Sequence, residues 1–96
     1  MKFLTLLIIN FFDFFHKRKI LKFFYSKQIY NFDIVFDIGA HKGETISYFN
    51  KHFTVNKIYA FEPSPSNFEI LKKNLKKIKL KNSIKIHLEN FAVGEV

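Results

Sequence analysis

The sequence predicts an α/β domain that is built on a parallel β-sheet. Three short apolar segments, residues 34–36, 58–61 and 84–88, have the composition of strands, and two segments in which apolar residues recur at helical spacing lie between them. Strands that alternate with helices form βαβ units, in which neighbouring strands run parallel. We therefore expect the order βαβαβ from residue 31 onward.

The first helix of this unit is expected between about Gly43 and Lys51. Glu44 would lie near its positive N-terminal end, where a carboxylate is stabilising. Helical spacing would turn three apolar side chains toward the interior, namely Ile46, Phe49 and Phe53.

The second helix is expected to begin near residue 64 or 66 and to continue to about residue 77. Ser64 followed by Pro65 fits an N-cap with proline at the first helical position, whereas Ser66 and Glu69 fit a capping box. The lysines of this segment would lie on the solvent side, opposite the apolar residues Phe68, Leu71, Leu75 and Ile78.

The three strands differ in the burial that their sequences predict. Residues 34–36 are all apolar, which is typical of a strand that is buried on both faces, whereas residues 84–88 alternate and indicate one wet face or an edge position. In a doubly wound sheet of order 3-2-1-4-5, the first strand is central and the third lies at the edge. Both patterns agree with that topology, although we expect no strand on the other side of residues 34–36.

A glycine-containing turn connects the first strand to the first helix. Asp37, Gly39 and Gly43 form the spacing D-x-G-x-x-x-G directly after residues 34–36. Glycine lets the backbone approach a ligand closely, and the first N–H groups of a helix remain free to donate. The spacing differs from the dinucleotide fingerprint and from the P-loop. The turn is therefore a candidate ligand site, with a purely structural turn as the alternative.

An acidic residue also follows the second strand. Glu62 comes after residues 58–61 and before Pro63, and it lies 25 residues beyond Asp37. In nucleotide-binding βαβ units an acidic residue about 20 residues further on binds the ribose hydroxyls. Glu62 is therefore a candidate nucleoside ligand, with a glutamate in solvent at the end of a strand as the alternative.

These residues resemble the FkbM-type methyltransferases. The resemblance rests on residues 35–43 (VFDIGAHKG), 59–63 (YAFEP) and 92–95 (AVGE), which appear in the family's order. It implies a Rossmann-like class I methyltransferase fold and S-adenosyl-L-methionine as the cofactor. Carried over, the turn faces the methionine part of the cofactor and Glu62 holds its ribose, so that the implied cofactor-binding residues are Asp37, Gly39, Ala40, His41, Gly43 and Glu62.

His41 stands where many members of that family have asparagine. Its position in the turn would allow it to act as a base or to touch the substrate, and a structural or solvent-facing histidine is the alternative. The resemblance identifies no catalytic residue. The acceptor that it implies is a sugar, a lipid or another small molecule.

Relatives continue with further strands that include an acidic D-x-E-G stretch, and the chain contains no Glu-Gly dipeptide. Residues 31–96 are therefore interpreted as the cofactor-binding N-terminal half of such a domain, a truncated βαβαβ unit. A non-catalytic nucleotide- or cofactor-binding fragment and a basic membrane-associated protein are the alternatives.

Residues 1–30 are expected to form an N-terminal helical leader. The segment from Phe3 to Phe15 is apolar except for Thr5, Asn10 and Asp13. It is too short to span a bilayer and is followed by the basic residues 16–19. Aromatic residues beside a basic cluster suit a membrane surface, and packing on the domain is the alternative. The sequence thus predicts a cytoplasmic protein with a peripheral membrane contact through residues 3–22.

The composition narrows the possible functions further. The absence of cysteine excludes disulfides and thiol catalysis, and the four histidines lack metal-ligand spacing, so no metal site is expected. The net charge of +8 would suit nucleic acid, but the lysines of the second helix are accounted for as its solvated face. No nucleic-acid partner is therefore expected.

Overall fold

The computed structural model describes residues 2–10, 17–81 and 84–92. Within these ranges helices and strands alternate along the chain, which confirms the α/β class. The strands are β1 (Lys2–Asn10), β2 (Ile29–Ile38), β3 (Thr54–Phe61) and β4 (Lys85–Glu89). The helices that connect them are α1 (Lys17–Ser26), α2 (Glu44–His52) and α3 (Pro65–Lys77).

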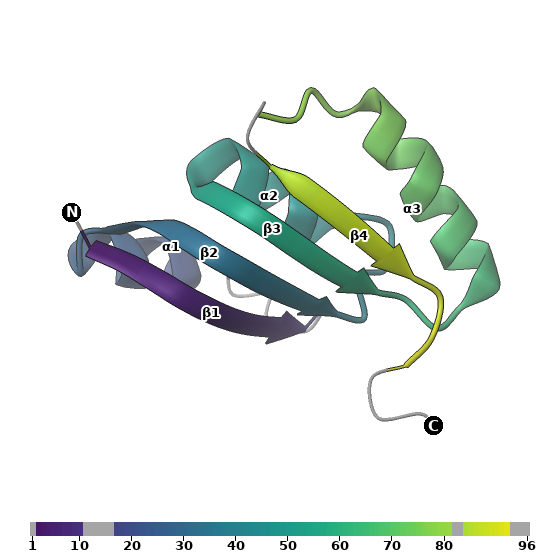
Figure 1. The fold of residues 1–96 in the computed structure, drawn as a ribbon, viewed down its shortest axis with the longest axis horizontal. Coiled ribbons are helices and arrows are strands. Elements are labelled where there is room, and N and C mark those ends of the chain that lie inside the picture. Colours follow the sequence, from purple (N-terminus) through teal and green to yellow (C-terminus); the bar gives the residue numbers. More distant parts are fainter. Residues whose placement is uncertain (1, 11–16, 82–83, 93–96) are drawn as a thin grey trace.

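The described strands form one sheet in the order β1-β2-β3-β4, and every neighbouring pair is parallel (Figure 1). The predicted neighbours β2, β3 and β4 therefore lie side by side in the expected order. β4 is at the edge, and its side chains alternate between exposed and half-buried, as its sequence predicts. Its half-buried residues Ile86 and Leu88 pack against the core.

Residues 2–10 do not form the helix that was expected for the leader. Lys2–Asn10 is a strand, and it pairs with β2 on the side that was predicted to lack a neighbour, with Leu7 beside Val35. A short apolar run fits a strand as well as a buried helix, and periodicity alone does not distinguish the two. Ile9 is 5% exposed and Ile8 is 57% exposed, which is the alternation of a strand.

Within the described part of residues 1–30, the prediction of a helix is right for α1 alone. Residues 11–16 lie outside the described part of the chain, and the division at residue 30 stays a prediction. No helix within the described ranges is long and apolar enough to cross a membrane. Contact of residues 3–22 with a membrane surface stays a prediction.

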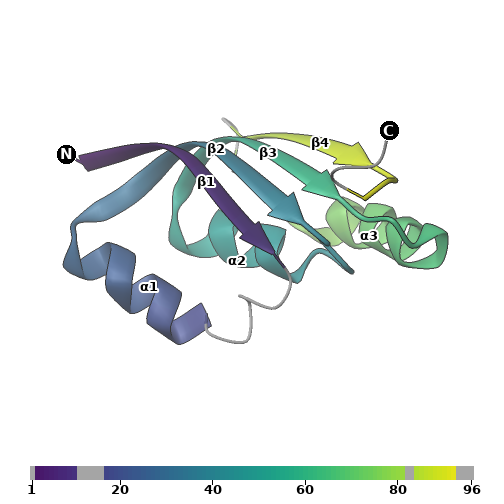
Figure 2. The same cartoon turned by 90° about the horizontal axis from the view of Figure 1, so that it is seen from below.

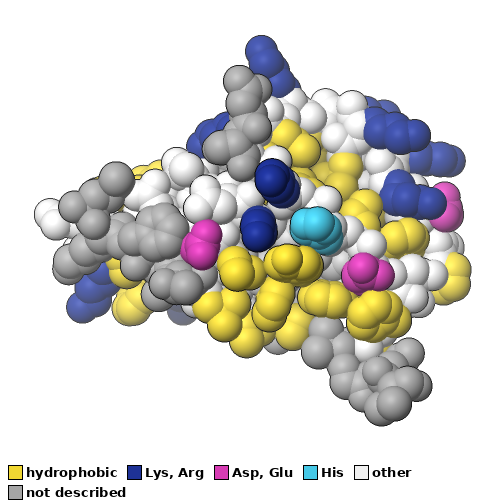
Figure 3. Space-filling model, viewed as in Figure 1, with side chains coloured by type: hydrophobic (Ala, Val, Ile, Leu, Met, Phe, Trp, Pro, Cys, Tyr) yellow, Lys and Arg dark blue, Asp and Glu magenta, His cyan; other side chains and the backbone are white. Residues whose placement is uncertain are grey.

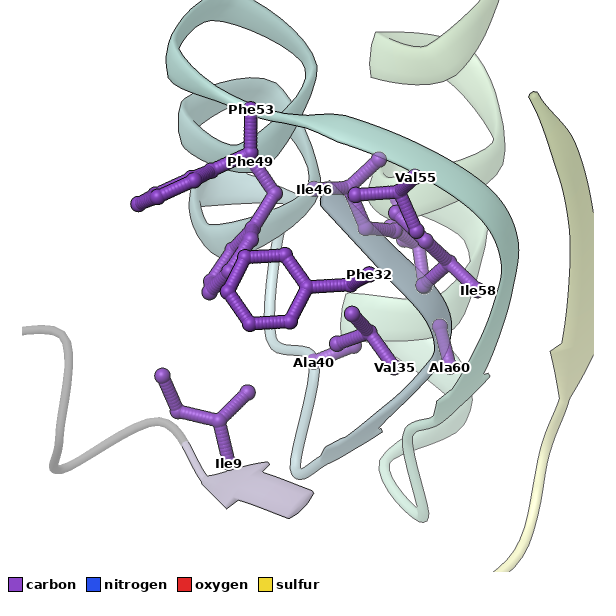
Figure 4. Packing of buried hydrophobic residues seen from close by; sticks show 11 residues of the cluster. Ile9, Phe32, Val35, Ala40, Ile46, Phe49, Phe53, Val55, Ile58 and Ala60 are labelled. Carbon is purple, nitrogen blue, oxygen red and sulfur yellow. The ribbon is translucent and has the colours of Figure 1, made fainter. Parts of the chain in front are cut away.

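All helices that the structure describes lie on the same side of the sheet (Figure 2). The core fills the space between them and the sheet, and Phe32 of β2 is at its centre (Figure 4). Its ring meets the rings of Phe49 and Phe53 edge to face, with centroids 5.5 and 5.0 Å away. The three residues predicted to face inward from the first helix, Ile46, Phe49 and Phe53, are all buried.

The opposite face of the sheet carries no helix among the described residues. Figure 3 looks onto this face and shows hydrophobic side chains gathered over the strands, with lysine and histidine among them. Phe36, Tyr59 and His87 are neighbours in register across β2, β3 and β4, and the Tyr59 and His87 rings stack with centroids 4.8 Å apart. The prediction that residues 34–36 are buried on both faces is therefore wrong, because only Val35 among them is fully buried.

The start of α3 decides between the two predicted caps. The Ser64 hydroxyl accepts a hydrogen bond from the Asn67 N–H, and Pro65 is the first helical residue. Glu69 forms an ion pair with Lys72 instead of closing a capping box. The lysines of α3 are exposed while Leu71 is buried, as expected for an amphipathic helix.

Candidate functional site

The turn between β2 and α2 contains three residues with left-handed backbone conformation. Gly39, His41 and Gly43 have φ angles of 71°, 55° and 97°. The first two residues of the turn, Gly39 and Ala40, both donate their N–H groups to the Phe61 carbonyl, at 2.8 and 2.9 Å. The turn is therefore folded over the carboxyl end of β3. Glycine suits positions 39 and 43 because other residues rarely adopt this conformation, and His41 is the exception among the three.

Gly43 has a second reason to be glycine. It is the N-cap residue of α2, and a Cβ atom added to it would lie 3.1 Å from Cδ1 of Leu71 in α3. The start of α2 is thus packed closely against α3. The side chain of Leu71 therefore leaves little room for a larger residue at this position.

Glu62 lies beside this turn and is only 5% exposed. Its Oε1 accepts the His41 N–H at 2.6 Å, and its Oε2 accepts the Ser64 N–H at 2.9 Å. The carboxylate therefore joins the turn after β2 to the start of α3. The alternative of a glutamate in solvent is wrong.

Asp37, the last buried residue of β2, is 0% exposed. Neither of its carboxylate oxygens has a hydrogen-bond partner in the described part of the chain. Burial, followed by repulsion from Glu44 and then Glu62, raises the pKa of this carboxyl to about 7. Three acidic groups therefore lie near one another at one edge of a chain whose net charge is +8.

The side chain of His41 points to the first residue of α2. Its Nδ1 lies 3.2 Å from Oε2 of Glu44, and Oε1 of Glu44 accepts the Lys42 N–H at 2.9 Å. Glu44 therefore stabilises the turn from the helix side, as Glu62 does from the strand side. The sequence predicted only a favourable charge at the helix N-terminus, and nothing in the residue spacing indicated these two contacts.

Asn90 is a further residue that the sequence did not single out. Its amide donates to the Glu62 carbonyl at 2.7 Å and to the Pro63 carbonyl at 3.3 Å. It follows β4 directly, as Glu62 follows β3, so the polar residues at the carboxyl ends of neighbouring strands meet. The position of Asn90 directly after a strand was the signal in the sequence that could have identified it.

The structure brings together all the residues that the sequence selected for this site. Residues 93–95 of the third motif lie outside the described residues. Across residues 2–10, 17–81 and 84–92, no cluster of three histidine, aspartate or glutamate side chains could hold a metal ion. The arrangement offers buried carboxylates and a glycine turn at the end of parallel strands, which suits a small ligand with cationic and hydrogen-bond-donating groups.

One comparison with known proteins identifies a relationship for this part of the chain. The family described as the methyltransferase FkbM domain matches residues 37–95, which is more than half of the chain and begins at Asp37. No curated protein and no solved structure matches the sequence.

Proposed function

Because the chain belongs to the FkbM methyltransferase family, we propose that it binds S-adenosyl-L-methionine at the turn between β2 and α2. The proposed binding residues are Asp37, Gly39, Ala40, His41, Gly43 and Glu62. The observation that carries this proposal is the buried carboxylate of Asp37, which has no hydrogen-bond partner among the described residues and is repelled by Glu44 and Glu62.

The charge of this site supports a cationic ligand. S-adenosylmethionine carries a sulfonium and an ammonium group, and opposite charges close to a carboxylate favour its ionised form. Binding would therefore relieve the repulsion that Glu44 and Glu62 exert on Asp37. An apolar or anionic ligand would leave this repulsion unrelieved.

The hydrogen-bonding capacity of Glu62 supports a ribose contact. An ionised carboxylate has about four acceptor sites, and the two backbone N–H groups from His41 and Ser64 occupy two of them. The remaining sites can accept the hydroxyls of a ribose. The same side chain would then connect the ligand to the turn and to the start of α3.

When bound, this cofactor would supply an electrophilic methyl group, which would pass to a lone pair of the acceptor as the carbon–sulfur bond broke and the acceptor's proton left to a base or to water. The residues of this chain contribute binding and alignment. The proposed acceptor is a sugar, a lipid or another small molecule.

The test compares parts of the cofactor. Nuclear magnetic resonance titrations of S-adenosylmethionine, adenosine and methionine into the full chain are repeated with Glu62→Ala. Glu89→Ala, which removes an exposed glutamate at the end of the neighbouring strand, is the matched control. We expect the Glu62 variant to bind S-adenosylmethionine and adenosine more weakly by about 1–3 kcal/mol, the range for lost charged hydrogen bonds.

Methionine should bind the Glu62 variant as it binds the wild-type chain, because it has no ribose. Equal weakening of adenosine and methionine would show that Glu62 acts only by holding the turn. If the folded wild-type chain binds none of the three ligands, the proposed function is wrong. Cofactor binding without methyl transfer to any acceptor would favour the non-catalytic alternative.

A further inference from the structure

A groove lies between α1 and α2 on the helix side of the sheet, where the two helices are side by side (Figure 2). Its volume is about 530 Å³, which lies within the size range of small-molecule sites. It begins beside the turn that we propose as the cofactor site. The lining residues are Arg18 and Leu21 of α1 and Glu44, Ser47, Tyr48, Lys51 and His52 of α2.

One face of α2 forms the wall of this groove. Its lining residues recur at intervals of three and four, which places them in one stripe along a helix. Glu44 is the first residue of the stripe and His52 is the last. Because Glu44 also bonds His41 and Lys42, the groove and the turn share this residue.

The charges of the side chains that line the groove favour an anionic ligand. The carboxylate of Glu44 is already engaged by the turn, with one contact to each of its oxygens. Arg18 and Lys51 form no ion pair with any residue that the structure describes. Two cations therefore line the groove, and the one acidic group among the lining residues is directed to its partners in the turn.

The aromatic residues in the groove favour a ligand that contains a ring. The Tyr48 and His52 rings lie with their centroids 4.4 Å apart. Burial, and after it the charges of Lys51 and Lys81, lower the pKa of His52, which favours the neutral imidazole. Burial and Tyr25 raise the pKa of the Tyr48 phenol, and the charge of Arg18 opposes them, so the protonated phenol is favoured.

We propose that the groove binds the methyl acceptor, and that this acceptor is an anionic ring compound, a sugar that carries a phosphate or a carboxylate. Arg18 and Lys51 bind the anionic group, and the Tyr48 and His52 rings contact the sugar. The acceptor's hydroxyls then extend past Glu44 toward the turn. This inference rests on the proposed function, because the turn must supply the methyl group.

The probe is glucose 6-phosphate, with glucose and inorganic phosphate as its two halves. Each is titrated into the full chain while the nuclear magnetic resonance signals of the Tyr48 and Lys51 backbone amides are followed. The double variant Arg18→Gln/Lys51→Gln removes both groove cations. Lys19→Gln/Lys73→Gln removes the same charge from exposed positions outside the groove and is the matched control.

We expect glucose 6-phosphate to bind the control variant and the wild-type chain alike, and the groove variant at least tenfold more weakly. Glucose and phosphate alone should each bind more weakly than the complete probe. Absence of binding to the folded wild-type chain, or equal affinity for the groove and control variants, would overturn the inference. Equal affinity for phosphate and for glucose 6-phosphate would overturn the ring contact.

The same samples are titrated with S-adenosylmethionine. Its binding should be unchanged in Arg18→Gln/Lys51→Gln, because neither residue belongs to the turn. Binding of the cofactor without binding of the sugar phosphate would contradict the acceptor site in the groove and leave the proposed function standing. Failure of the wild-type chain to bind the cofactor contradicts the proposed function instead.

Discussion

Asp37→Asn should change how the stability of the chain depends on pH. The substitution keeps the size of the side chain but removes a buried negative charge that lies close to Glu44 and Glu62. Burial is the largest cause of the raised pKa of Asp37, and repulsion from the two glutamates adds to it. The folded chain therefore holds the Asp37 proton more tightly than the unfolded chain does.

The magnitude follows from the two pKa values. The carboxyl has a pKa of about 7 in the folded chain and an ordinary value of 3.8. Between these values the folded state binds more protons, so the contribution of Asp37 is fully present below pH 3.8 and is lost as the pH rises through 7. At 1.36 kcal/mol for each pH unit, the loss amounts to about 4 kcal/mol above pH 8.

The assay is urea unfolding of wild type and Asp37→Asn at a series of pH values from 4 to 9. The free energy of unfolding of the variant minus that of wild type should rise by about 4 kcal/mol across this range. A constant offset from burying an amide does not affect the slope. Asp33→Asn serves as the control, because it removes a charge from the same strand. The Asp33 carboxylate accepts a hydrogen bond from the Asn56 amide. Parallel curves for wild type and Asp37→Asn would refute the reasoning.

Four further substitutions test other parts of the structure by urea unfolding at pH 7. Gly43→Ala should destabilise the chain by about 1–3 kcal/mol, because the residue has a φ of 97° and packs against Leu71; an unchanged midpoint would contradict this contact. Ile9→Ala should cost about 2–4 kcal/mol and Ile8→Ala less than about 0.5 kcal/mol, because only Ile9 is buried; equal effects would argue against β1 as a strand. Glu62→Gln should cost about 1–3 kcal/mol, since its amide nitrogen would face a backbone N–H; wild-type stability would argue against the two bonds.

The sequence predicted the elements that carry strong local signals. The turn after β2 was identified because Gly39 and Gly43 interrupt apolar patterns, and α3 because Ser64 and Pro65 mark its start. β1 was missed because a short, mainly apolar run is ambiguous between strand and helix, and only pairing with β2 decides it.

The contacts within the site were less predictable than its residues. Glu62 was selected for its place after β3, but its two backbone bonds depend on how the turn and α3 approach each other. The open face of the sheet likewise depends on all three connections placing their helices on one side (Figure 2). Such arrangements are properties of the assembled sheet, and residue patterns within single segments do not contain them.

The order of the strands also has a kinetic consequence. β1 to β4 succeed one another across the sheet, so the strand order does not reverse among the residues that the structure describes. In doubly wound sheets the ligand crevice lies at such a reversal, between helices on opposite faces. Among the described residues, helices would flank a ligand at the carboxyl edge of this sheet on one side alone. Few contacts then oppose its departure, and we expect a short residence time, with affinity limited by rapid dissociation and not by slow association.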